Sequence, residues 1–130
     1  STLQEIKPQG AALWCVFGCG GNRDRGKRPL MGAAAVQGAD KVVVTSDNPR
    51  NEDPDEIIRQ MATGVADNDR GKVLCITNRR EAIRTAAALA RKGDIILLAG
   101  KGHETYQEIK GVRNHFNDKE ELSKALQEKN

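Results

Sequence analysis

The sequence predicts an α/β fold, with a mostly parallel sheet, helices on both faces and an antiparallel hairpin at its C-terminal edge. Short apolar runs alternate with helical patterns at least three times, and the connections between them are short. The tail is different, because two strand patterns flank Lys110–Gly111, which is typical of a hairpin. Aromatic residues make up 3% of the chain, so we expect a core of Val, Ile, Leu and Ala, as in buried parallel sheets.

Strands are expected where apolar runs end in turn-forming residues. These runs cover residues 13–17, 42–44, 73–76 and 94–99. The tail contributes two further strands at 106–109 and 112–116. Residues 1–9 have Leu3 and Ile6 at helical spacing and stop at Pro8, as in the last turns of a helix.

Four helices are expected between and after these strands. They cover residues 29–37, a segment that begins at Pro54, residues 79–91 after the cap Asn78, and a closing segment that Asp118 caps. The side chains predicted to face inward are Ile57, Ile58, Met61 and Val65 in the second helix, Ala82, Ile83, Ala86, Ala87, Leu89 and Ala90 in the third, and Leu122, Ala125 and Leu126 in the fourth.

Composition restricts the function. The 130 residues fit one domain, and the charge of +3, with no aromatic residues among the basic ones, argues against nucleic-acid binding. Neither an export signal nor an apolar run of membrane-spanning length occurs, so we expect no membrane association. Cys15, Cys19 and Cys75 are odd in number and lack paired metal-binding spacing, which predicts reduced thiols in a cytoplasmic protein and no metal site.

The segment Asp47-Asn48-Pro49-Arg50 follows the most β-branched strand and is the leading candidate for a binding loop. In α/β sheets, ligands bind at the carboxyl ends of the strands. Pro49 stiffens the backbone, and Arg50 offers a planar set of donors that matches a carboxylate or a phosphate. The alternative is an ordinary strand-to-helix connection with a solvated arginine.

A glycine-rich loop, residues 18–28, follows the first strand. Gly21 to Lys27 fits the beginning of a phosphate-binding pattern, but Arg28 stands where Ser or Thr would hold magnesium, which argues against an autonomous nucleotide hydrolase. The glycines would let backbone N–H groups approach a ligand. The basic residues expected around that ligand are Arg23, Arg25, Lys27 and Arg28. The alternative is a solvated basic loop.

A third loop, residues 100–106, follows the last apolar strand. Gly100 and Gly102 permit a tight turn, and Glu104 is able to accept hydrogen bonds from an ammonium group. His103 beside a carboxylate suggests acid–base chemistry, but a structural hydrogen bond is favoured because no nucleophile is evident beside it. Together the loops offer arginines for carboxylates and acids for amines, which are the two needs of an amino acid.

These three loops resemble those of the C-terminal domain of the Mur ligases, and most closely those of members that add meso-diaminopimelate. The similar segments are residues 17–31, 45–50 and 98–104, in the family's order and at similar spacing. The resemblance covers almost the whole chain from about Leu13. It implies a Rossmann-like domain that delivers the incoming amino acid, with residues 1–130 forming that single domain.

The resemblance also implies a reaction. Full enzymes of the family carry an N-terminal domain for the UDP-sugar substrate and a central ATPase domain, which would bind ATP and Mg²⁺; neither is expected in this chain. The carboxylate of a UDP-N-acetylmuramoyl dipeptide becomes an acyl phosphate, which the amine of meso-diaminopimelate attacks. The implied diaminopimelate contacts are Arg23, Asp47, Asn48, Pro49, Arg50, Gly100 and Glu104, with Lys27 as a phosphate contact.

The chain departs from the family at Asn22 and Arg25, where Asp and Lys are usual, and it has no complete phosphate-binding loop or magnesium-binding carboxylates. We therefore expect an excised domain that is inactive alone and monomeric by default, and we predict no catalytic residue in it. Two alternatives remain: a free-standing Rossmann-like module that binds a nucleotide or an amino acid, and a domain of another ligase of the Mur superfamily. The Asp47–Arg50 segment favours a diaminopimelate ligase over the other ligases, and restored amide formation with the two missing domains would separate a ligase domain from a binding module.

Overall fold

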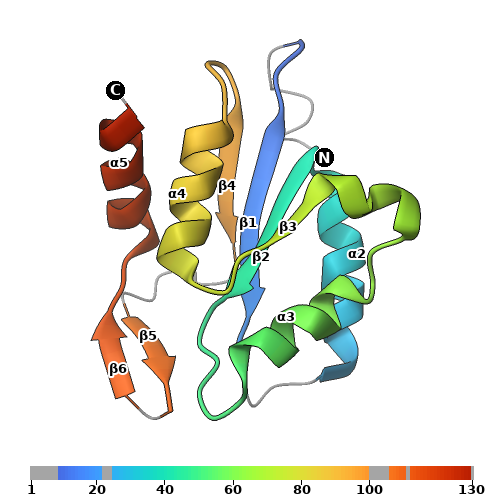
Figure 1. Cartoon of the computed structure of the whole chain (residues 1–130), viewed down its shortest axis with the longest axis vertical. Coiled ribbons are helices and arrows are strands. Elements are labelled where there is room, and N and C mark those ends of the chain that lie inside the picture. The colour runs from blue at the N-terminus through green and yellow to red at the C-terminus, as the bar shows by residue number, and fades with distance from the viewer. Residues whose placement is uncertain (1–8, 22–24, 100–105, 111, 130) are drawn as a thin grey trace.

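The computed structural model describes residues 9–21, 25–99, 106–110 and 112–129. Strands and helices alternate through most of this part of the chain (Figure 1). The elements are β1 (Leu13–Cys19), the 3₁₀ helix η1 (Arg25–Lys27), α2 (Arg28–Gly38), β2 (Lys41–Ser46), α3 (Pro54–Ala62), the 3₁₀ helix η2 (Asp67–Lys72), β3 (Val73–Cys75), α4 (Arg79–Leu89), β4 (Ile95–Ala99), β5 (Tyr106–Ile109), β6 (Val112–His115) and α5 (Asp118–Lys129).

The central sheet has four strands in the order β3-β2-β1-β4, and all neighbours run parallel. β1 lies inside the sheet, where Phe17 pairs with Val44 on one side and Ala99 on the other. The predicted parallel sheet is confirmed. Because the strands are parallel, the connections after β1, β2 and β4 all begin at the same edge, the lower edge in Figure 1.

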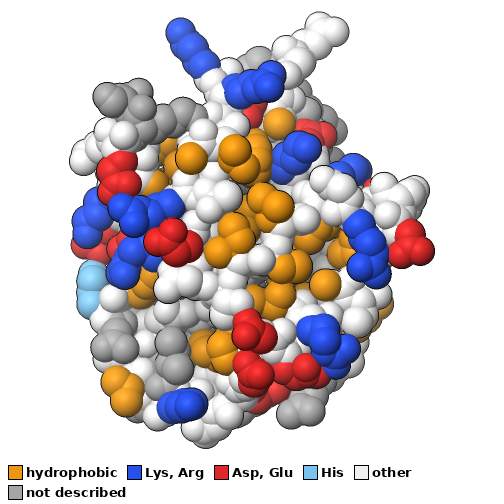
Figure 2. All heavy atoms as spheres, in the orientation of Figure 1, with side chains coloured by type: hydrophobic (Ala, Val, Ile, Leu, Met, Phe, Trp, Pro, Cys, Tyr) orange, Lys and Arg blue, Asp and Glu red, His pale blue; other side chains and the backbone are white. Residues whose placement is uncertain are grey.

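Alternation along β1 divides the core between the two faces of the sheet. Leu13, Cys15 and Phe17 pack with the buried residues of α2 and α3. Trp14 and Val16 point to the other face and pack with the alanines of α4 and with Phe116. The sheet is thus covered on both faces, as predicted. Figure 2 shows the hydrophobic side chains that remain visible between these layers, where β3 lies, and the charged ones gathered over α4 and α5.

Three predictions about the C-terminal third were wrong. The hairpin forms and is antiparallel, but β5 and β6 make a two-stranded sheet of their own instead of an edge of the main sheet. The α5 N-terminus is capped by Asn117, whose Oδ1 accepts from Lys119 and Glu120 N–H, while Asp118 pairs with Arg79. Leu89 and Leu126 are 54% and 41% exposed, whereas their neighbours Ala90 and Ala125 are buried, so both leucines lie outside the buried stripe of their segments.

The other predicted inward residues of α3 and α4 are buried, and Ala125 is buried in α5. The helix predicted to begin at Pro54 does begin there, and Asp53 caps it by accepting from Asp55 N–H. Asn78 caps α4 in the same way through Glu81 N–H. Within the described residues, no helix has the length and apolar content needed to cross a membrane.

Candidate functional site

The loop after β2 is held inside the protein at the carboxyl edge of the sheet. Asp47 and Asn48 are only 5% and 1% exposed, and Pro49 is also buried. Arg50 is half-buried and has a φ of 52°, in the left-handed region that a side chain of this size rarely adopts. Backbone strain of this kind gathers at ligand sites, where surrounding contacts must enforce it.

Those contacts come from two directions. Arg50 Nη1 donates to Gly21 O at 3.1 Å and to Asn48 O at 3.2 Å. The backbone O of Arg50 accepts from Lys110 N at 2.6 Å, in the turn of the β5–β6 hairpin. The loop is therefore fixed between the glycine loop after β1 and the hairpin.

The glycine loop and the Asp47–Arg50 loop are in direct contact, as predicted for loops at one edge of the sheet. Gly21 N donates to Asn48 O at 2.6 Å. A Cβ at position 21 would lie 1.8 Å from Pro49 O, which is far inside contact distance, so the approach requires glycine. Two of the three predicted loops thus meet.

Arg28 does not surround a ligand as predicted. Its side chain is 1% exposed and donates to both oxygens of Glu52, at 3.1 and 2.9 Å, and to Gln60 Oε1 at 2.7 Å. Nη2 also reaches Gly20 O at 3.2 Å. Arg28 therefore ties the glycine loop to the segment after Arg50. Lys27, its exposed neighbour, remains a predicted phosphate contact.

Sequence reasoning missed two residues that hold the same edge. Arg79 is 1% exposed and donates from Nη1 to Ser46 O at 3.1 Å and from Nη2 to Ala99 O at 3.3 Å. Gln107, in β5, donates to Ser46 Oγ at 3.1 Å and to Asp47 O at 2.8 Å. No local pattern signals either role, since their partners lie 20 to 61 positions away.

Arg23, Gly100 and Glu104, with His103, lie outside the described residues, so their predicted roles remain predictions. Among the residues that are described, no three His, Cys, Asp or Glu side chains form a group suited to a metal ion. Cys19 lies at this edge, but burial raises its pKa, with a raising effect of Asp47 and an opposing effect of Arg28. The thiol is therefore protonated near neutral pH and is a poor nucleophile.

Arg50 differs from the other two arginines described at this edge in whether an acidic side chain pairs with it. Arg28 pairs with Glu52, and Arg79 pairs with Asp118. Within the described part of the chain, the hydrogen-bond acceptors of Arg50 are neutral carbonyl oxygens. Arg50 thus brings positive charge that no described acid offsets, and its bonds use Nη1, so a carboxylate could be bound side-on through Nη2 and Nε.

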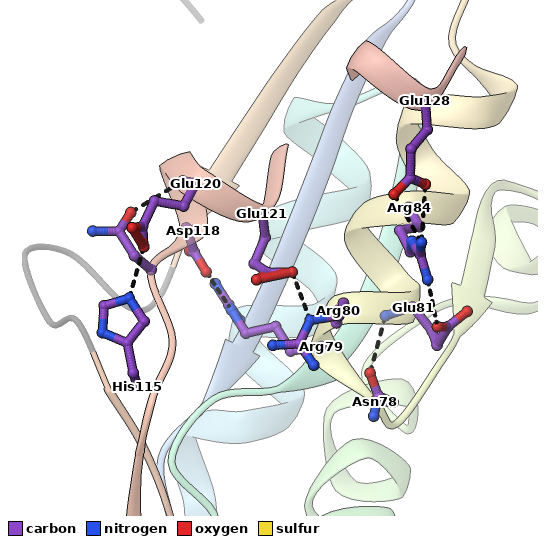
Figure 3. A network of polar contacts seen from close by, with 11 residues as sticks. Asn78, Arg79, Arg80, Glu81, Arg84, His115, Asp118, Glu120, Glu121 and Glu128 are labelled. Carbon is purple, nitrogen blue, oxygen red and sulfur yellow. Dashed lines mark hydrogen bonds and ion pairs between the residues drawn. The ribbon is translucent and has the colours of Figure 1, made fainter. Parts of the chain in front are cut away.

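A groove of about 200 Å³ lies between α4 and α5, and Figure 3 shows charged side chains of the two helices that pair with one another. Its lining residues are Arg80, Arg84, Glu121, Lys124, Ala125 and Glu128. Arg80 pairs with Glu121 at 2.6 Å and Arg84 with Glu128 at 2.9 Å, so much of its charge is already compensated. The groove contains none of the loop residues and is not the candidate site.

Comparisons with known proteins agree with the geometry. The family model described as "Mur ligase, glutamate ligase domain" matches residues 1–102. The UDP-N-acetylmuramoyl-L-alanyl-D-glutamate–2,6-diaminopimelate ligase of Neisseria meningitidis serogroup A is 63% identical over 127 residues, which are 97% of this chain and 25% of that protein. The ligase of the same name from Parabacteroides distasonis is 61% identical over 120 residues, 92% of this chain and 25% of that protein.

A solved structure of a ligase with this name superposes with a TM-score of 0.89 at 51% sequence identity. The match covers 98% of this chain and 26% of the other. The chain thus spans about a quarter of the length of the relatives it matches.

Proposed function

This chain belongs to the Mur ligase, glutamate ligase domain family, and from that premise we propose that it is the C-terminal, amino-acid-binding domain of a ligase that adds meso-diaminopimelate to UDP-N-acetylmuramoyl-L-Ala-D-Glu. The names of the relatives support this assignment, as does the length of the match. The remaining domains would bind ATP, Mg²⁺ and the UDP-linked dipeptide. Among the described residues, no group of three His, Cys, Asp or Glu side chains is suited to hold a metal ion.

The observation that carries the proposal is the guanidinium of Arg50 at the carboxyl edge of the sheet, whose acceptors among the described residues are neutral carbonyl oxygens. Diaminopimelate has a distal carboxylate that lysine lacks. A guanidinium held by one nitrogen has its other side suited to two parallel hydrogen bonds to that carboxylate. Arg50 thereby selects the amino acid, because an analogue without the carboxylate offers this half-buried cation no anion to pair with.

The other predicted residues complete the proposed site. Asp47, Asn48 and Pro49 fix the path of the loop, and Arg23, Gly100 and Glu104 are the further proposed contacts to the amino acid. In the reaction, the dipeptide carboxylate accepts the terminal phosphoryl group of ATP, and ADP leaves. The diaminopimelate amine then attacks the acyl carbon and forms the amide bond. The bond between that carbon and the phosphate oxygen breaks, inorganic phosphate leaves, and the nitrogen loses a proton.

The cysteines suit a cytoplasmic reaction. All three are free thiols, and Cys15 and Cys19 are buried. Unpaired cysteines are the rule in reducing compartments. We propose that the domain acts in the cytoplasm as part of a monomeric enzyme.

The test replaces the matching quarter of the Neisseria meningitidis ligase with this chain. We expect ATP- and diaminopimelate-dependent phosphate release, with the amide product identified by mass spectrometry. Arg50→Ala should weaken diaminopimelate binding by about 2–5 kcal/mol, seen as a raised KM, because a desolvated charge pair is lost. Arg59→Ala is the control, since Arg59 is exposed on α3 and pairs with Glu56 in the same helix.

Two results would contradict the proposal. A correctly folded chimera that releases no phosphate would favour a free-standing binding module. An active chimera in which Arg50→Ala leaves the KM for diaminopimelate unchanged would contradict the role of Arg50 in selecting the amino acid.

A further inference from the structure

Arg79 occupies an unusual place for a cation. It is the first residue of α4, its side chain is 0% exposed, and a helix N-terminus repels positive charge. Asp118 offsets this cost by accepting from Nε at 2.8 Å and from Nη2 at 2.6 Å. Asp118 itself begins α5, where a carboxylate is favoured. The two-point pairing fixes the plane of the guanidinium.

The rest of the guanidinium is directed at the ends of two strands. Nη1 donates to the carbonyl of Ser46, the last residue of β2, and Nη2 donates to that of Ala99, the last residue of β4. Asp47 follows Ser46 directly. The position of Arg79 therefore sets where the backbone of the Asp47–Arg50 loop leaves the sheet.

A network centred on Ser46 strengthens this connection. Ser46 Oγ donates to Thr77 O at 2.7 Å and accepts from Gln107 Nε2 at 3.1 Å. Thr77 lies two residues before Arg79, in the connection from β3 to α4. The same residue of β2 is thus held through its carbonyl by Arg79 and through its hydroxyl by the neighbouring connection.

We propose that Arg79, oriented by Asp118, is a positioning residue for amino-acid recognition. It acts through Ser46 and holds the Asp47–Arg50 loop in the position from which Arg50 contacts the ligand carboxylate. This inference rests on the proposed function. Its physical basis is that reacting and recognising groups must be held to within about an ångström, and a displacement of that size costs about 100-fold in rate.

The structure supplies a matched control on the same pair of helices. Arg84 also joins α4 to α5, through Glu128 at 2.9 Å, but it is 46% exposed and pairs as well with Glu81 of its own helix (Figure 3). A purely structural role in clamping the helices would be shared by both arginines. A positioning role belongs to Arg79 alone.

The experiment compares Arg79→Lys and Arg84→Lys in the chimeric ligase. Lysine keeps the charge but has no planar fork, so it does not bind Asp118 at two points while reaching both strand carbonyls. We expect Arg79→Lys to raise the KM for diaminopimelate by about 10- to 100-fold and to leave the KM for ATP and for the UDP-linked dipeptide unchanged. Arg84→Lys should leave all three unchanged.

Hydrogen exchange provides a second readout that needs no ligand. The amides of residues 47–50 should exchange faster in Arg79→Lys than in the wild-type chimera and in Arg84→Lys. Asp118→Asn, which retains the shape of the acid, should accelerate the same amides. If Arg79→Lys does not fold, the KM values and the hydrogen exchange are measured on Asp118→Asn instead.

The outcomes separate the two proposals. An inactive wild-type chimera with faster exchange in Arg79→Lys overturns the proposed function and supports the effect of Arg79 on the loop. An active wild type whose KM for diaminopimelate is unaffected by Arg79→Lys overturns the positioning role. A rise shared by all three KM values also overturns it, because it indicates general destabilisation.

Discussion

The two edges of the parallel sheet are tied by groups of opposite charge. At the amino ends of the strands, carboxylates accept from backbone N–H groups: Asp40 from Leu13 and Asp94 from Ala12. At the carboxyl ends, guanidinium groups donate to backbone carbonyls: Arg79 to Ser46 and Ala99, and Arg28 to Gly20. Parallel strands leave unpaired N–H donors at their amino ends and unpaired carbonyl acceptors at their carboxyl ends. The charge of the side chains that bind these groups therefore follows from the direction of the strands.

Under the proposed function, this difference would suit the carboxyl edge to an acidic ligand. The groups that complete its hydrogen bonds are cations, and Arg28 and Arg79 are neutralised by Glu52 and Asp118. Arg50 performs the same task for Gly21 and Asn48 through neutral partners within the described residues. An anion bound beside Arg50 would give its guanidinium an acidic partner of the kind that Arg28 and Arg79 already have.

The largest effect is expected when a buried arginine is removed from the carboxyl edge. Arg79→Ala should lower the free energy of unfolding by about 3–5 kcal/mol, because it leaves Asp118 and two strand carbonyls without their cation. Urea denaturation measures this change. A loss no greater than that of an exposed surface pair would show that the edge does not depend on Arg79.

The next test breaks the amino edge. Asp94 accepts from Ala12 N at 2.9 Å, Arg91 N at 2.9 Å and Trp14 Nε1 at 3.1 Å. Asp94→Ala should cost about 2 kcal/mol, since hydrogen bonds to a charged group are lost from a half-buried site. Gln127→Ala, an exposed change in α5, is its control.

This second loss should depend on pH. Desolvation raises the pKa of Asp94, but the hydrogen bonds from Arg91, Ala12 and Trp14 outweigh it and hold the pKa below its ordinary value of 3.8. A lowered carboxyl pKa contributes stability that is present above the unfolded value and lost as pH falls through the folded one. The difference between wild type and Asp94→Ala should therefore shrink below pH 3.8. A difference that is constant with pH would contradict the role of the charge.

A smaller effect is expected from the hairpin. Gln107→Ala removes the two hydrogen bonds to Ser46 and Asp47, which should cost about 1 kcal/mol and accelerate amide exchange in the loop. Urea denaturation and hydrogen exchange report the two effects separately. Faster exchange confined to the hairpin would mean that β5 does not support the loop.

The smallest effect is expected at the groove between α4 and α5. Arg84 and Glu128 are 46% and 56% exposed, so Arg84→Ala should cost about 0.2–1 kcal/mol, less in high salt. Urea denaturation at two salt concentrations checks this. A cost equal to that of Arg79→Ala would remove the distinction between buried ties and surface pairs.

Most of the fold could be predicted from the sequence because each element carries its own local pattern. The strands are apolar runs, and Asn78 and Pro54 mark the helix starts that the structure confirms. Local patterns do not reveal the exact width of the buried stripe of a helix, which is why Leu89 was predicted inside and is exposed although Ala90 beside it is buried. They also do not show which sheet a hairpin joins.

The site was predicted in part for the same reason. The contact between the glycine loop and the Asp47–Arg50 loop follows from strand direction, which the alternation of elements reveals. Arg28 was wrongly placed around a ligand and Arg79 was missed, because their acidic partners Glu52 and Asp118 lie 24 and 39 positions away in the sequence. Burial of a charge is a property of the tertiary structure.

The contact between Gly21 and Pro49 has a consequence for protein engineering. Because a single methyl group at position 21 would overlap the carbonyl of Pro49, these two loops form one mechanical unit whose halves belong to different strands. Exchanging residues 47–50 for those of a lysine-adding relative would transplant half of that unit. Under the proposed function, a change in the backbone path of either loop would therefore displace the other.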